Sequence, residues 1–180
     1  RRVLEAARRL KYYPDAAARR LASGKTRTIA LVWHRAPDRT YRDAFLPGLL
    51  EGISRAARRF GYQVLFRPVE VDEPQGSYVE LVRGRHTDGL ILSGPRCDDT
   101  YVQTLHGEGF PIVLHGRLGD AGIPSVDVDN VQGAKTAVTH LLDLGHRRIG
   151  IITNAPLAYA ASHQRLEGYR TALRGAGFAC

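Results

Sequence analysis

From residue 28 onward, short apolar segments alternate with longer segments in which apolar residues recur at helical spacing. The apolar segments are nearly continuous, as in strands that are buried on both faces, and turn residues bound them. This alternation predicts an α/β fold: an open parallel sheet with helices on both faces. The predicted strands are 28–34, 62–68, 88–95, 111–116, 125–130 and 147–153, and the predicted helices are 43–62, 76–86, 98–109, 130–146 and 162–178.

The carboxyl ends of the predicted strands are where a ligand is expected, because open parallel sheets bind ligands at that edge. Two histidines, His34 and His115, stand at such ends. Each is a candidate for ligand contact. The alternative for each is a structural histidine that lies in a loop or caps a helix. The segments expected at this edge are 34–38, 67–72, 93–96, 115–118 and 153–156.

The sequence carries no motif that predicts catalysis on such a sheet. There is no G-x-G-x-x-G after a strand, no phosphate-binding loop and no H-E-x-x-H, and "LSGP" at 92–95 is no nucleophile elbow. Cys97 and Cys180 lack metal-ligand spacing and are expected as unpaired thiols. No apolar run approaches the roughly 20 residues that cross a bilayer. We therefore expect no enzymatic activity, no cofactor and no metal site.

The positive charge of the chain is concentrated at its N-terminus. The first 28 residues hold nine basic and two acidic side chains, while the net charge of all 180 residues is +8. A strongly basic arm on a nearly neutral body predicts a polyanionic partner for the arm alone.

A short helix is predicted within this basic arm. Pro14 and Asp15 favour a helix start, and Gly24 favours its end. A helix of about two turns is marginal in water, so it forms only where something else supports it. The alternative is a solvated basic linker.

Several motifs together resemble the lactose/galactose repressor (LacI/GalR) family of bacterial transcriptional regulators. The resemblance begins with "YYPDAAARRLASG" at 12–24 and includes "DGLIL" at 88–92. It closes with "HLLDLGHRRIGII" at 140–152 and "RLEGYRTAL" at 165–173. It implies a periplasmic-binding-protein-like (type I) parallel sheet with flanking helices, preceded by the remnant of an all-α helix-turn-helix headpiece and a hinge helix.

The resemblance also implies a division of the chain, which is expected to be truncated at both ends. Residues 1–13 would be the C-terminal remnant of the helix-turn-helix domain, and residues 14–25 the hinge helix and linker. Residues 26–128 would form an incomplete N-terminal effector-binding and dimerisation subdomain. Residues 129–180 would begin the C-terminal effector-binding subdomain.

In this family, two hinge helices pair in the minor groove of the operator and a leucine wedges open a base step. The matching wedge is Leu21, with Ala18 packed beside it. Basic residues next to it would neutralise phosphates, which gives affinity more than specificity. The residues that the resemblance assigns to DNA are Tyr12, Ala18, Arg19, Arg20, Leu21 and Lys25.

The resemblance places a small effector in a cleft between the two subdomains. Arg165 matches the family arginine that reaches ligand hydroxyls or carboxylates. Gly116 stands near a position where many relatives carry an acidic residue for sugar hydroxyls. Asp129 is either a cleft residue or the cap of the following helix. The expected effector-binding residues are Asp43, Phe45, Gly116, Arg117, Asp129 and Arg165.

The resemblance thus predicts a cytoplasmic regulator, a homodimer or tetramer, whose partners are operator DNA and a sugar-like effector. Induction and corepression are equally compatible with the sequence. The alternative on the same scaffold is a periplasmic-type sugar-binding transport protein. That class predicts a secretion signal and no basic hinge, and the opposite pattern is present here.

Overall fold

The computed structural model describes residues 2–12, 23–34, 45–70, 73, 76–119, 122–153 and 155–178. Its helices are α1 (Arg2–Arg9), α3 (Phe45–Arg59), α4 (Val79–Arg83), α5 (Thr100–Gly107), α6 (Asn130–Asp143) and α7 (Ala160–Gly175). Its strands are β1 (Thr28–His34), β2 (Gln63–Val69), β3 (Gly89–Ser93), β4 (Ile112–His115) and β5 (Ser125–Val126).

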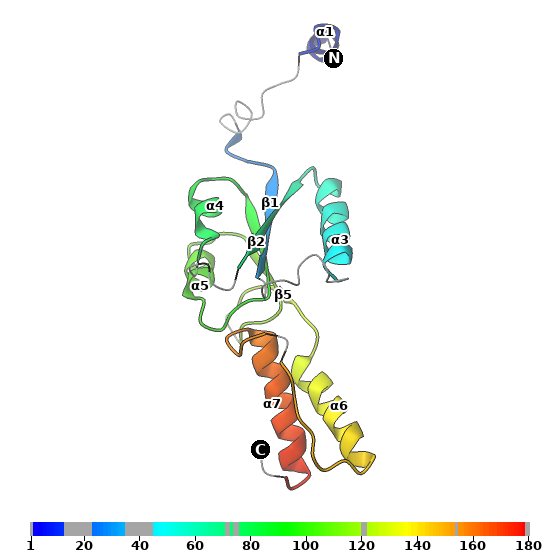
Figure 1. The fold of residues 1–180 in the computed structure, drawn as a ribbon. Coiled ribbons are helices and arrows are strands. Elements are labelled where there is room, and N and C mark those ends of the chain that lie inside the picture. The colour runs from blue at the N-terminus through cyan, green and yellow to red at the C-terminus, as the bar shows by residue number, and fades with distance from the viewer. Residues whose placement is uncertain are drawn as a thin grey trace.

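The five strands form one parallel sheet in the order β2-β1-β3-β4-β5. Figure 1 shows α3 on one face of this sheet and α4 and α5 on the other. The expected open parallel sheet with helices on both faces is therefore confirmed. Because all strands run the same way, their carboxyl ends lie together at one edge.

The core of the sheet is built around β1. Ala30, Leu31 and Val32 are 0% exposed, since β1 lies between β2 and β3 and is covered on both faces. Ala30 and Val32 belong to the cluster that includes Tyr78 and Leu105. Leu31 lies between them in the strand and points to the opposite face, as alternation along a strand requires.

Helices α6 and α7 pack on each other as a pair with its own small cluster: Val138, Leu142, Ala172 and Leu173. The pair lies beyond the carboxyl edge of the sheet (Figure 1). Gly168 of α7 permits their close approach, because a Cβ there would overlap the backbone oxygen of Val131.

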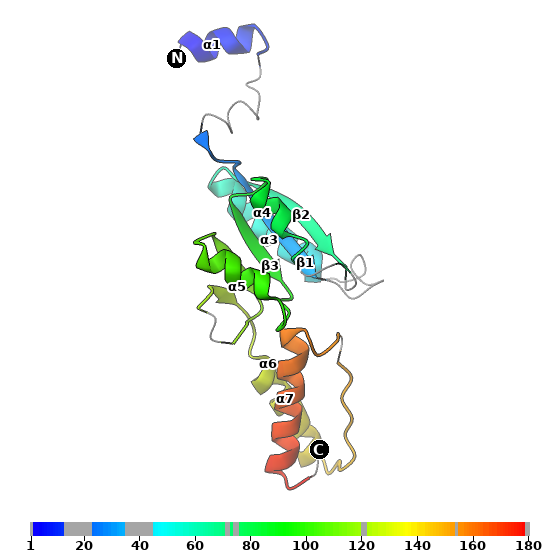
Figure 2. The same ribbon diagram turned by 90° about the vertical axis from the view of Figure 1, so that its left-hand side faces the viewer.

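The prediction of a strand at 147–153 is wrong, because the structure has no strand there. The segment is extended beside α7 (Figure 2), but it pairs with no strand in the described part of the chain. Its contacts are instead to the helix pair, as in the 2.7 Å bond that the Tyr169 hydroxyl donates to the Ile149 carbonyl. Because no strand lies beside this segment, the side chains that point away from the helix pair stay exposed, and Ile152 is 98% exposed.

The strand predicted at 125–130 forms only at Ser125–Val126, because the residues that follow turn into α6. Most of the predicted hinge helix falls on residues 13–22, outside the described residues. No helix that the structure describes is long and apolar enough to span a membrane.

Candidate functional site

The carboxyl ends of β3 and β4 place Ser93 and His115 side by side. The two residues are opposite each other in the parallel register, and Ser93 Oγ lies 2.7 Å from His115 Nδ1. Burial lowers the pKa of His115 below its ordinary value, and the opposing charge of Asp127 does not offset it. At neutral pH the ring is therefore neutral, with its orientation set by the serine.

Phe45, the first residue of α3, stacks on the His115 ring. The centroids are 5.4 Å apart and the planes differ by 16°. Phe45 is nonetheless 53% exposed, so one side of the stack stays accessible. The carboxyl edge of the sheet thus carries an aromatic surface next to the polar Ser93–His115 pair.

His34, at the end of β1, lies between two tyrosines. Its ring meets Tyr78 and Tyr159 edge-on, with centroids 6.2 and 6.5 Å away. Burial lowers the pKa of His34, against the raising effect of Asp99. Its Nδ1 atom is buried and has no hydrogen-bond partner among the described residues, which is unusual for a buried polar atom.

Tyr78 is held by the adjacent helix. Its hydroxyl donates a 2.8 Å hydrogen bond to Oδ2 of Asp99, which in turn caps α5 by accepting from the Tyr101 backbone. Burial, with the charge of Asp99 next, raises the pKa of Tyr78 far above its ordinary value. Tyr78 therefore remains a neutral hydrogen-bond donor across the accessible pH range.

Arg165 and Asn130 join α7 to α6 at the end of the pair that faces the sheet. Arg165 Nε donates to Asn130 Oδ1 at 2.9 Å. The amide of Asn130 donates to Asp127 Oδ1 at 3.2 Å and to Gln164 Oε1 at 3.1 Å. Asn130 is 5% exposed, so its side chain is a fixed support that orients the guanidinium.

Other predicted effector residues have more structural roles. Asp129 caps α6, with Oδ1 accepting from the Gln132 N–H at 2.8 Å, which is the alternative that the sequence left open. Gly116 has φ 112°, and a Cβ there would lie 2.7 Å from Pro95 Cδ. A carboxylate side chain at 116 would therefore require this loop to move. Arg117 lines a shallow hollow of about 440 Å³ with residues 118–119 and 122–125.

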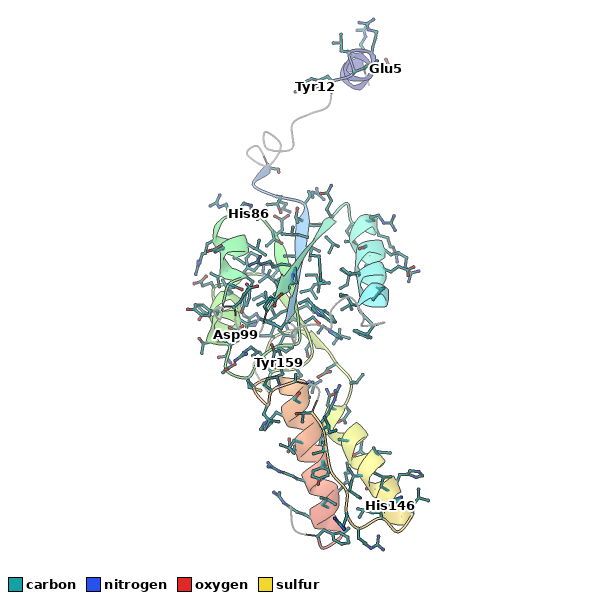
Figure 3. All side chains as sticks on the ribbon, viewed as in Figure 1. Glu5, Tyr12, His86, Asp99, His146 and Tyr159 are labelled. Atoms are coloured by element: carbon teal, nitrogen blue, oxygen red, sulfur yellow. The ribbon has the colours of Figure 1, made fainter. Side chains whose placement is uncertain are left out.

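The strand end of β3 also contacts the segment before α7. Arg96 and Tyr159 form an isolated antiparallel bridge, and the Ala160 N–H donates to the Pro95 carbonyl at 3.1 Å. The Arg96 guanidinium lies 5.5 Å from the centre of the Tyr159 ring. Figure 3 shows Asp99 and Tyr159 near this junction of sheet and helix pair.

The predicted DNA-contact residues are mostly outside the described residues: Ala18, Arg19, Arg20 and Leu21, as is the predicted effector residue Asp43. Tyr12, just after α1, is 63% exposed, and Lys25 is also exposed. The described residues therefore do not test whether the predicted DNA-contact side chains lie together.

Sequence reasoning missed Asp88, whose carboxylate accepts hydrogen bonds from the two residues just before β1. Its carboxylate accepts from the Thr26 N–H, the Thr26 hydroxyl and the Arg27 N–H at 2.7, 2.8 and 2.9 Å. Desolvation alone would raise the pKa of Asp88, but these donors and the charge of Lys25 lower it overall. The available signal was an aspartate at the start of a predicted strand, in "DGLIL".

Within the described part of the chain, no three His, Cys, Asp or Glu side chains group as a metal site. The residues at the carboxyl edge are aromatic rings, amides, a hydroxyl and a guanidinium. They can stack on a ring and exchange hydrogen bonds with it, which is the chemistry of reversible binding.

A family model and individual relatives match this chain, and both point to the same family of proteins. The family described as "Periplasmic binding proteins and sugar binding domain of LacI family" matches residues 28–180. The HTH-type transcriptional regulator CelR of Thermobifida fusca is 35% identical over 183 residues, covering 97% of this chain and 52% of that protein. MalR of Streptococcus pneumoniae, another HTH-type transcriptional regulator, is 32% identical and is covered to 53%.

Solved structures agree with the sequence comparisons. The complex of the transcriptional regulator CelR with cellobiose superposes with a TM-score of 0.67 at 31% identity, covering 99% of this chain and 53% of that one. The expected periplasmic-binding-protein-like fold is confirmed. The chain spans about half the length of the curated relatives it matches.

Proposed function

The chain belongs to the LacI family, and from this premise we propose that the whole protein is a transcriptional regulator, a repressor, controlled by a sugar-like effector. The observation that carries the proposal is the family match over residues 28–180, joined to a strongly basic segment before residue 28. Relatives that match the chain almost throughout are named HTH-type regulators, which favours this function over a periplasmic transport protein.

The effector site is proposed at the carboxyl edge of the sheet, facing α6 and α7. A sugar ring has apolar C–H faces and a rim of hydroxyls, so it suits an aromatic surface flanked by hydrogen-bonding groups. The Phe45–His115 stack supplies the surface. Arg165, oriented by Asn130, supplies charge-assisted donors, and His34 Nδ1 is a buried atom in need of a partner.

The remaining predicted effector residues keep narrower roles in this proposal. Arg117 would approach the ligand from the loop after β4, and Asp43 from the residues just before α3. Gly116 would give the ligand room, and Asp129 would hold the first turn of α6 in place.

The division of the chain supports control of DNA binding from this site. We take residues 26–128 as the N-terminal subdomain and residues 129–180 as the start of the C-terminal one. One apolar cluster lies in the sheet and also takes in Ala160 at the start of α7, and a second cluster lies wholly between α6 and α7. An effector that binds one relative orientation of the two subdomains better shifts the population toward it. In a homodimer, that shift would move the two basic segments toward or away from each other.

DNA contact is proposed for the basic segment. Residues 1–13 would end the helix-turn-helix domain, and 14–25 would form the hinge helix with Leu21 as the wedge and Ala18 beside it. Phosphate contact is assigned to Tyr12, Arg19, Arg20 and Lys25. The protein would act in the cytoplasm, without enzymatic activity.

The test is operator binding by the full-length protein. A band-shift assay on palindromic DNA next to its own gene should show a specific complex that scrambled DNA does not give. Leu21→Ala should weaken this complex and remove operator bending while sugar binding is unchanged. Equal binding to palindromic and scrambled DNA, with and without sugars, would contradict the proposal.

A further inference from the structure

The end of the sheet opposite the candidate effector site is positively charged. Five exposed basic residues gather there, and we call them the basic end: Lys25, Arg27, Arg58, Arg59 and Arg85. None of them belongs to the residues that the family resemblance assigns to DNA, apart from Lys25. Figure 3 places His86, the neighbour of Arg85, at this same end.

Three segments far apart in the sequence converge to form the basic end. β1 starts between β2 and β3, with the Gln63 N–H donating to the Arg27 carbonyl at 2.9 Å and the Asp88 N–H to the Thr28 carbonyl at 2.8 Å. Arg58 and Arg59 end α3 shortly before β2, and Arg85 follows α4 shortly before β3. The parallel sheet brings the starts of β1, β2 and β3 to one edge (Figure 1), and the five cations stand in the residues just before these starts.

Nearby carboxylates offset only part of this charge. Asp88 keeps its negative charge while it accepts from the neutral Thr26 and Arg27 donors, and it attracts Lys25. Glu108 pairs with Arg83 at 2.6 Å. Among the described residues, none of the five basic side chains forms an ion pair with a carboxylate. Arg27 instead lies 5.7 Å from the centre of the Tyr62 ring.

The basic end is also where the N-terminal segment joins the sheet. The chain from Gly24 to Thr28 spans at most about 14 Å when extended. The screening length at 0.1 M salt is about 10 Å, so cations at the far end of this span act only weakly on a polyanion bound by that segment, and a contribution to binding requires DNA to approach the basic end itself.

We propose that the basic end binds the phosphate backbone of DNA flanking the operator. The inference rests on the proposed operator binding, and it adds a second DNA contact made by the effector-binding body itself. Contacts of arginine with phosphate depend on salt and are largely independent of base sequence. The opposing explanation is that Arg58, Arg59 and Arg85 only offset the negative carboxyl ends of α3 and α4 and stay solvated.

The test compares two pairs of substitutions that remove the same charge from opposite ends of the molecule. Arg58→Gln with Arg85→Gln alters the basic end. Arg148→Gln with Arg174→Gln serves as the control and alters two exposed positions, one in the segment between α6 and α7 and one in the last turn of α7. Both are made in the full-length protein, and circular dichroism melting verifies the fold.

Fluorescence anisotropy measures DNA affinity against salt for the bare operator, for an operator with added flanks and for an unrelated duplex. With the flanked operator, the basic-end variant should bind about tenfold more weakly at 0.1 M salt. Its salt slope should fall by roughly 1 for each phosphate that it no longer neutralises, while the control keeps the wild-type slope. Equal slopes for both variants and wild type, on every duplex, would overturn the inference.

Failure of the proposed function gives a different result from failure of this inference. If the wild-type protein does not prefer the operator to the unrelated duplex, operator recognition is wrong. The slopes on the unrelated duplex still decide whether the basic end contacts phosphates.

Discussion

Asp88 accepts a 2.7 Å hydrogen bond from the backbone N–H of Thr26, a residue 62 positions earlier in the chain. The same carboxylate oxygen also accepts from the Thr26 hydroxyl. The loop before β3 thereby fixes the path by which the basic N-terminal segment enters β1. This contact therefore lies on the chain connection between the proposed effector site and the basic N-terminal segment.

Replacing Asp88 by Asn should loosen this attachment. The amide has nearly the same size, but its NH2 group would face a backbone or hydroxyl donor where the carboxylate accepts. We expect a loss of about 1–3 kcal/mol in the free energy of unfolding and faster hydrogen exchange at the Thr26 and Arg27 amides. Urea unfolding and exchange mass spectrometry measure these effects.

Thr26→Ser is the matched control, since it retains the hydroxyl and the backbone donor. It should keep both stability and exchange protection close to wild type. If Asp88→Asn behaved like Thr26→Ser, the carboxylate would have no part in holding the linker.

Acid should weaken the fold through His34 and His115. Burial lowers the pKa of each in the folded state, so the unfolded chain takes up protons at a higher pH. The two neutral histidines contribute fully to the free energy of unfolding above the pKa of the unfolded chain, near 6.5. This contribution is lost as the pH falls from there through the lower pKa of the folded state. Urea unfolding at pH 8 and pH 5.5 should show lower stability at pH 5.5.

His34→Phe keeps an aromatic ring between Tyr78 and Tyr159 but cannot titrate. Its loss of stability between pH 8 and pH 5.5 should be smaller than that of the wild type. A loss of equal size would mean that His34 does not contribute to the acid sensitivity.

Gly168→Ala should destabilise the pairing of α6 and α7. The added methyl group would overlap the Val131 carbonyl and press on the Ala134 side chain, which costs about 1–3 kcal/mol. Gly133 of α6 has no neighbour within 4 Å of an added Cβ, so Gly133→Ala should stabilise by about 0.5–1 kcal/mol. Thermal unfolding of the two variants should move in opposite directions, and a shared direction would contradict this packing.

Arg165→Lys should weaken sugar binding by the full-length protein about tenfold or more. Lysine keeps the charge but lacks the planar group that Asn130 orients. Arg174→Lys, in the last turn of the same helix, should bind like wild type. Isothermal titration calorimetry with a sugar found by thermal-shift screening makes the comparison, and equal affinity for all three proteins would remove Arg165 from the site.

Local pattern predicted the strands well where burial on both faces leaves a continuous apolar run, as at Ala30–Val32 and Leu90–Leu92. It was wrong at 147–153, because an apolar run predicts a strand whether or not a partner strand lies beside it. The pairs Asp88–Thr26 and Asn130–Arg165 were not predictable from spacing. Their members lie far apart in the sequence, and only the assembled sheet and helix pair bring them together.

The Ser93–His115–Phe45 group shows the same limit at the candidate site. His115 was predicted at a strand end, which parallel order suffices to indicate. The serine that contacts His115 depends on the register of β3 against β4. The ring that stacks on His115 depends on where α3 begins relative to the end of β4. Neither follows from the periodicity of the separate segments.

A sugar bound between the two subdomains should change the affinity of the full-length protein for its operator. Fluorescence anisotropy of labelled operator DNA, with and without a saturating sugar, measures this coupling. We predict a change in Kd of about fivefold or more, in either direction, that Arg165→Ala abolishes while operator binding itself persists. An operator Kd that is unchanged by a sugar that demonstrably binds would contradict control of DNA binding from this site.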